Sequence, residues 1–236
     1  MPGGDWSRRS LLGAGAAAGA LLAACASASA QQRKAHEEAK GGNEELPPTE
    51  DLMREHGVLR RVLLVYEEAG RRIQADEELP PDAVAGGADI VRRFIEDYHE
   101  KLEEQFLFPR FRQAGQLVEL VDTLQTQHEA GRRVTQRIQR LSAPEALAGA
   151  DSRRQLVSAM QAFARMYRPH AAREDTVLFP ALRKLLSPQE FEALGEKFES
   201  IEHERFGENG FEDVLGRVEQ IERSLGIYDL ARFTPA

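Results

Sequence analysis

Histidine and glutamate residues recur in two spaced strings, and each string occurs twice in the same order along the chain. A lone histidine followed four residues later by Arg-Arg-Val occurs at His56 and again at His128. A histidine followed four residues later by a glutamate, and then by Leu-Phe-Pro, occurs at His99 and again at His170. The repeats lie 72 and 71 residues apart, so the two halves agree to within one residue. This agreement indicates an internal duplication.

These strings present metal-ligand side chains at a suitable spacing, because residues four apart on an α-helix lie on one face. The candidate metal ligands are His56, His99, Glu103, His128, His170 and Glu174. Buried without partners, such groups would each cost several kcal/mol, and two divalent cations bridged by the glutamates would offset that cost. Each metal would take two imidazoles, one oxygen from each glutamate and a bridging solvent oxygen, which leaves a position open for a small ligand.

Each part of this set has a simpler interpretation when it is taken alone. A single histidine on an apolar helix face is often a hydrogen-bonded core residue, and one His-x3-Glu pair can be a helix salt bridge. The occurrence of all six in register across a repeat favours metal binding. Nitrogen and carboxylate ligands suit iron, manganese or zinc, and the single cysteine excludes an iron–sulfur cluster.

The elements that must position these residues are predicted to be helices. Apolar residues recur at spacings of three, four and seven, as on one face of an α-helix, and strand-like alternation is missing from the sequence. Four long helices are expected over about 49–79, 88–108, 116–141 and 151–186, then a shorter one from the capping box at 187–190 and another over 211–225. Thr49 is the expected N-cap of the first. The chain is therefore predicted to be all-α, an up-down-up-down four-helix bundle with additional C-terminal helices.

The combined pattern over about residues 49–186 resembles the hemerythrin-like (HHE cation-binding) family. The resemblance implies two iron ions, bridged by an oxo or hydroxo group and by carboxylates, with manganese or zinc a weaker match. It also implies that the site binds or reacts with oxygen, peroxide or nitric oxide. Oxygen-carrying hemerythrins have a second histidine where this chain has Arg132, and their last acid falls at Asp175 rather than Glu174. Reversible oxygen carriage is therefore not expected. Asp175 is the rival of Glu174 as a ligand, and Glu100 or Glu104 is expected to support the ligands.

The N-terminal residues resemble an export signal of the twin-arginine type. Arg8-Arg9 precede an apolar run that is too short to span a bilayer, and the run ends in Leu-Ala-Ala-Cys25, which resembles a lipoprotein box. Cys25 is thus the expected lipidation site, and cleavage after Ala30 is the alternative. The polar residues that follow are typical of a flexible tether. The protein is predicted to be exported to the periplasm or cell envelope and anchored in the membrane through Cys25.

The predicted organisation is a signal peptide (1–24), a tether (25–46), a hemerythrin-like bundle (47–186) and a C-terminal helical extension that packs on the bundle (187–236). A net charge of −8 argues against a nucleic-acid partner, and the arginine pairs 60–61 and 132–133 are interpreted as solvated helix faces. The predicted function is a non-haem di-iron protein that binds or reacts with oxygen, peroxide or nitric oxide in a protective role. The alternative is an oxygen- or iron-sensing or metal-binding module without turnover.

Overall fold

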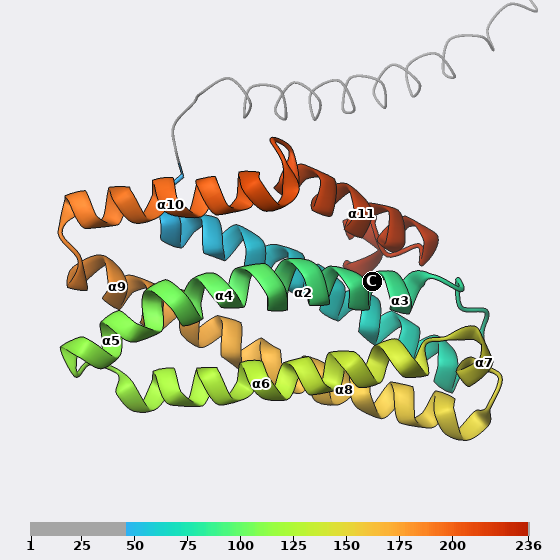
Figure 1. Cartoon of the computed structure of the whole chain (residues 1–236). Helices are drawn as coiled ribbons and strands as arrows, with labels where there is room; N and C mark the ends of the chain where they lie inside the picture. The colour runs from blue at the N-terminus through green and yellow to red at the C-terminus, as the bar shows by residue number, and fades with distance from the viewer. Residues whose placement is uncertain (1–45, 236) are drawn as a thin grey trace, which may run out of the picture. The chain divides into compact units, whose positions relative to one another are not determined.

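The computed structural model describes residues 46–235, and all regular secondary structure within that range is helical. The elements are α2 (Pro48–Gln74), α3 (Ala83–Ile90), the π-helix η1 (Val91–His99), α4 (Glu100–Leu102), the π-helix η2 (Glu103–Leu107), α5 (Phe108–Ala114), α6 (Val118–Leu141), α7 (Pro144–Leu147), α8 (Ala150–Arg173), the π-helix η3 (Glu174–Leu178), α9 (Phe179–Leu185), α10 (Pro188–Phe206), α11 (Gly210–Ser224) and the 3-10 helix η4 (Leu230–Phe233). Figure 1 shows four rods, formed by α2, by α3 to α5, by α6, and by α8 to α9. The prediction of an all-α bundle with additional C-terminal helices is confirmed.

The first and third rods begin differently from the expectation. The first begins at Pro48, and Thr49 lies inside its first turn rather than at the N-cap. Proline is well suited to the start of a helix because the N–H that it lacks would have no partner there. The third rod begins at Val118, because Leu117 has a left-handed φ of 50° that a helix cannot continue through.

Three π-helical turns occur where the second and fourth rods carry the candidate ligands. One ends at His99, and repeat-related turns begin at Glu103 and at Glu174. Pro109 and Pro180 follow the latter two turns, and a prolyl ring clashes with the carbonyl four residues earlier in a regular α-helix. A local widening to π geometry relieves that conflict, and π turns are frequent at functional sites.

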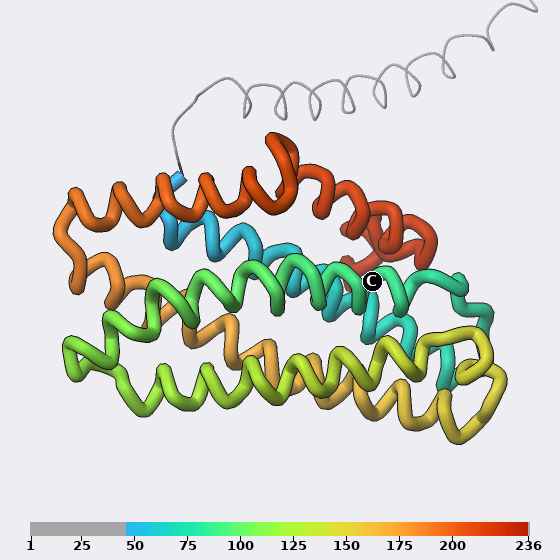
Figure 2. Tube along the Cα trace, viewed as in Figure 1, coloured from blue at the N-terminus to red at the C-terminus, as the bar shows by residue number. Residues whose placement is uncertain are grey.

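The C-terminal helices α10 and α11 lie along the bundle beside α2, as the tube in Figure 2 also shows. Arg61 on α2 binds the buried carboxylate of Glu222 on α11, with Nε at 2.9 Å from Oε1. The backbone carbonyl of Leu225 accepts a hydrogen bond from Arg72 at 2.8 Å. These contacts fix α11 to the first rod.

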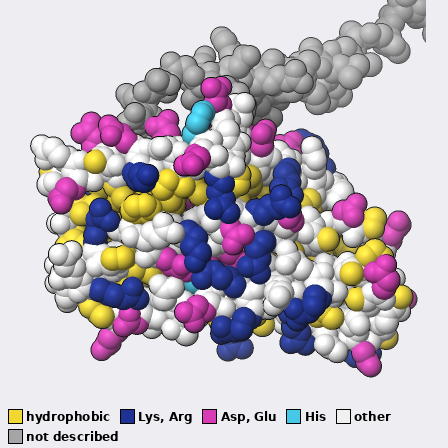
Figure 3. Space-filling model, in the orientation of Figure 1, with side chains coloured by type: hydrophobic (Ala, Val, Ile, Leu, Met, Phe, Trp, Pro, Cys, Tyr) yellow, Lys and Arg dark blue, Asp and Glu magenta, His cyan; other side chains and the backbone are white. Residues whose placement is uncertain are grey.

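The surface is charged and the interior is mostly apolar, with buried polar groups around the candidate ligands and at a few other positions such as Glu96 and Glu222. On the face drawn in Figure 3, Lys and Arg side chains gather over the middle of the bundle with Asp and Glu side chains among them. Among the described helices, none combines the length and the apolar character that crossing a membrane requires. The export signal and Cys25 lie outside the described residues.

Candidate metal centre

The four predicted histidines meet in the middle of the bundle as two pairs. His56 and His99 bring their Nε2 atoms to 3.1 Å, and His128 and His170 bring theirs to 3.2 Å. Each pair joins a lone histidine from one rod with the histidine of a His-x3-Glu string from the next. All four rings are buried, with at most 3% exposure.

The two predicted glutamates lie between the histidine pairs and span them. Glu174 places Oε2 at 3.3 Å from Nε2 of His56 and Oε1 at 3.2 Å from Nε2 of His170. Glu103 places Oε2 at 3.7 Å from Nε2 of His99 and at 3.4 Å from Nε2 of His128. Each carboxylate therefore reaches both pairs, which is the arrangement of a bridging ligand.

The donor atoms fit a pair of divalent cations. Both oxygens of Glu103 and both oxygens of Glu174 are buried and lack a hydrogen-bond partner. Burial and the nearby Glu174 hold the pKa of Glu103 well above its usual value. Burial acts in the same direction on Glu174, but His170 and His56 outweigh it and hold its pKa well below the usual value. Unpartnered buried carboxylates are costly, and bridged cations would satisfy them.

The outward nitrogen of each imidazole meets a side-chain oxygen. The Nδ1 contacts are His56 with Asp175 at 2.7 Å, His99 with Glu55 at 2.5 Å, His128 with Glu104 at 3.1 Å and His170 with Gln127 at 2.8 Å. When Nδ1–H donates to these oxygens, each Nε2 presents its lone pair to the interior. This is how metal-binding histidines are commonly fixed in tautomer and orientation.

Arginines extend two of these contacts in the same way in both halves. Arg60 pairs with Asp175, and Arg132 pairs with Glu104 at 2.5 Å. The interpretation of the arginine pairs as solvated faces is therefore wrong for Arg61 and Arg132, whose half-buried side chains bind buried acids, while Arg60 is exposed as expected. Arg133 is exposed, as expected.

The acids that were rivals or supporters occupy distinct places. Glu174 faces the Nε2 atoms, whereas Asp175 contacts Nδ1 of His56. Glu104 contacts Nδ1 of His128, while Glu100 accepts a hydrogen bond from Tyr167 instead of contacting a ring. The structure brings the six candidate ligands together, and metal ligation by them stays a prediction. His203 is exposed and lies outside this set.

Sequence reasoning missed Glu55 and Gln127, the oxygen acceptors of His99 and His170. These two residues directly precede the lone histidines and lie 72 residues apart. Their matching positions in the repeat could therefore have identified them from the sequence. Sequence reasoning also missed the role of Tyr167, whose ring lies with its centroid 5.2 Å from that of His170. The Tyr167 hydroxyl donates a hydrogen bond to Oε1 of Glu100 at 2.6 Å.

Phenylalanine rings cover one side of two imidazoles, one in each half. Phe179 stacks on His56 with the ring centroids 5.6 Å apart, and Phe108 stacks on His128 with the ring centroids 5.5 Å apart. These phenylalanines come from the repeated Leu-Phe-Pro triplets. Such apolar walls limit the access of water to the metal positions and lower the local dielectric.

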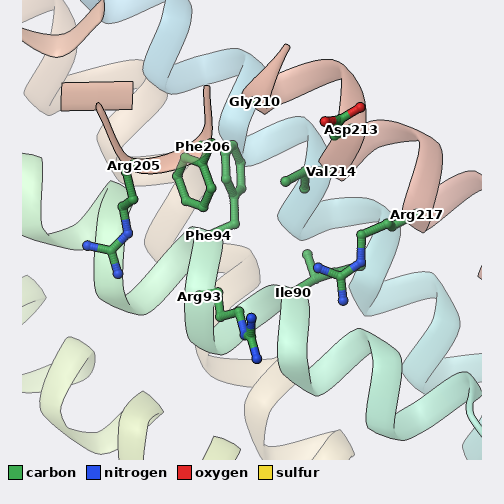
Figure 4. Close-up of a pocket in the computed structure, with 9 residues that line it drawn as sticks. All are labelled: Ile90, Arg93, Phe94, Arg205, Phe206, Gly210, Asp213, Val214 and Arg217. Atoms are coloured by element: carbon green, nitrogen blue, oxygen red, sulfur yellow. The ribbon is translucent and has the colours of Figure 1, made fainter. Parts of the chain in front are cut away.

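A separate hollow of about 480 Å³ lies on the surface between η1 and the C-terminal helices. Figure 4 shows its phenylalanine pair, Phe94 and Phe206, with Arg93, Arg205 and Arg217 around them. None of the six candidate ligands lines it. The hollow is therefore separate from the histidine cluster.

The fold and the site define a class of protein, a helical bundle whose inward histidines and glutamates form clusters that could hold metal ions. The hemerythrin HHE cation binding domain matches residues 48–182, and the chain belongs to that family. Two uncharacterized proteins, Mb2018 of Mycobacterium bovis and Rv1995 of Mycobacterium tuberculosis, are each 54% identical over 196 residues, which cover 81% of this chain and 76% of theirs. No solved structure matches the chain significantly.

Proposed function

We propose that this chain binds two iron ions through its six inward side chains and reacts with oxygen, peroxide or nitric oxide in a protective role. The observation that supports this most directly is that Glu103 and Glu174 each reach both histidine pairs. A site with two metals and two bridging carboxylates suits small oxidants and diatomic ligands. When bound, iron would supply the electrons that such oxidants accept.

The protein's own contribution is to hold the ligands and to keep the site dry. The Nδ1 contacts fix the orientation of the imidazoles, and the stacked phenylalanines exclude water on one side of the cluster. With two imidazoles and two carboxylate oxygens on each metal, coordination positions remain for a small ligand. Large substrates do not fit this interpretation, because the six candidate ligands are all buried.

Metal analysis and a visible spectrum of the purified full chain test the metal proposal. Two irons per chain with charge-transfer absorption are expected, and a colourless, metal-free protein would contradict it. His56→Ala should lose iron, whereas the matched change at the exposed His203 should not. Consumption of peroxide and nitric oxide by the iron-loaded protein then tests the protective role. Spectral changes without consumption would favour the sensing alternative, and inertness toward both ligands would refute the proposed reaction.

We also propose an envelope location, with a lipid anchor at Cys25, on the basis of the N-terminal sequence pattern. Fractionation of cells that express the full chain tests this location. The protein should sediment with membranes, and Cys25→Ser should release it. A wild-type protein in the soluble cytoplasmic fraction would refute the anchor.

A further inference from the structure

A second group of acids lies where α10 crosses the start of α2. Asp51, Glu55 and Glu202 each offer a carboxylate oxygen, and these three atoms lie within 4.8 Å of one another. Asp51 and Glu55 are four residues apart on α2, so they share a face. Glu202 comes from α10, which lies beyond the part of the chain that matches the family.

Positive charge near this acidic group is sparse. Arg54 reaches Asp51 only at 3.4 Å, and its guanidinium also lies over the ring of Phe211 at 4.0 Å. The negative charges of Glu199 and Glu212 act on the same carboxyl. One weak ion pair therefore faces several acids.

Glu55 gives an independent indication that a ligand belongs there. Its side chain is fully buried, and its Oε1 atom lacks a hydrogen-bond partner. Its other oxygen contacts Nδ1 of His99 at 2.5 Å. An unpartnered buried carboxylate oxygen costs free energy, and a bound cation would remove that cost.

Glu202 is held in place by groups that are not acids. The backbone N–H of Phe211 donates to its Oε1 at 3.0 Å, and the hydroxyl of Tyr98 lies 3.4 Å from its Oε2. Carboxylate oxygens alone, without nitrogen or sulfur, suit a hard divalent cation such as Mn²⁺, Mg²⁺ or Ca²⁺.

We propose that Asp51, Glu55 and Glu202 bind a third divalent cation, on the Nδ1 side of the His99 ring. This site is separate from the proposed di-iron centre and does not depend on its chemistry. Glu55 connects the two, because one of its oxygens contacts the His99 ring and the other is available to the third cation. The C-terminal extension would thus complete a metal site that the bundle alone lacks.

Binding of Mn²⁺ to the metal-free full chain, followed by the electron paramagnetic resonance signal of the unbound ion, tests this proposal. The wild-type protein should bind three equivalents, and both Glu202→Gln and Asp51→Asn should bind two. The matched control is Glu196→Gln, an exposed acid on the same helix that is not among the charges acting on Asp51, and it should retain three. Circular dichroism checks that each variant is folded.

The outcomes separate this proposal from the di-iron proposal. A wild-type protein that binds two equivalents, both kept in Glu202→Gln, would overturn the third site and leave the histidine site intact. A single equivalent that disappears in Glu202→Gln would support the third site and contradict binding at the histidine cluster. Three equivalents that survive in both acidic-cluster variants would also overturn the proposal.

Discussion

Replacing Asp175 by asparagine should weaken metal binding without abolishing it. Asp175 contacts Nδ1 of His56 at 2.7 Å and lies outside the ring of Nε2 atoms. Changes to such outer hydrogen bonds lower metal affinity by about 10–100-fold, which corresponds to about 1.4–2.8 kcal/mol. Glu174→Gln should have a larger effect, because an amide NH2 would replace one of the two carboxylate oxygens, which would remove a ligand from one metal position and break the bridge between the two. That variant should keep at most one of two equivalents.

Anaerobic titration with ferrous iron, in competition with a chromogenic chelator, measures both effects on the same scale. Asp151→Asn is the matched control, since its side chain is 82% exposed on the same rod and should leave the affinity unchanged. If Asp175→Asn lost the metals while Glu174→Gln kept them, the two acids would have exchanged roles. A wild-type affinity in Asp175→Asn would refute the reasoning that this hydrogen bond orients His56.

Three further variants test packing and electrostatics in the same region. Gly131→Ala should destabilise the fold by about 1–3 kcal/mol in urea unfolding, because a Cβ there would overlap the ring of Tyr167. Burial raises the pKa of Glu100 to about 8, against opposing effects of Tyr167 and Arg132. Since this folded-state pKa exceeds the unfolded value, the metal-free chain should lose stability as the pH rises from about 4.5 to 8, and Glu100→Gln should reduce that loss. Arg61→Ala should lower the free energy of unfolding by about 1–3 kcal/mol, because it leaves Glu222 buried without its partner. It should also lower the hydrogen-exchange protection of α11.

Matched controls and contrary results make these three tests decisive. Gly216 faces open space in α11, so Gly216→Ala should stabilise the fold by about 0.5–1 kcal/mol. Arg154 forms an exposed pair with Asp151, and Arg154→Ala should keep the free energy of unfolding within about 0.5 kcal/mol of wild type. If the free energy of unfolding of Glu100→Gln differed from that of wild type by the same amount at pH 5 and at pH 8, the burial argument would be contradicted.

Helical periodicity and duplication made the bundle and its inward side chains predictable. On the first helix, His56 lies in a stripe with Leu52, Leu59 and Leu63, and the structure buries all four. The pattern succeeds because hydrophobic burial selects one face of each helix, and that selection is local in sequence. The repeat then carried the same reasoning to the third helix and His128.

Contacts between distant segments were not predictable in the same way. Arg61 finds Glu222 across 161 residues, and Glu202 reaches the start of α2 from the C-terminal extension. Neither pairing leaves a periodic signal, because an exposed acid and a buried acid look alike in one sequence. The π turns at Glu103 and Glu174 were also missed, since they depend on how the following prolines are accommodated.

The two halves of the duplication agree at the candidate ligands and differ just outside them. His99 faces the carboxylate of Glu55, whereas its counterpart His170 faces the amide of Gln127. A carboxylate acceptor makes an imidazole a stronger electron donor than an amide does. The metal held by His56 and His99 would therefore have two carboxylate-supported imidazoles, and the other metal only one. Two irons in such surroundings should be inequivalent and give two quadrupole doublets in a Mössbauer spectrum, and a single doublet would show that the outer residues do not distinguish them.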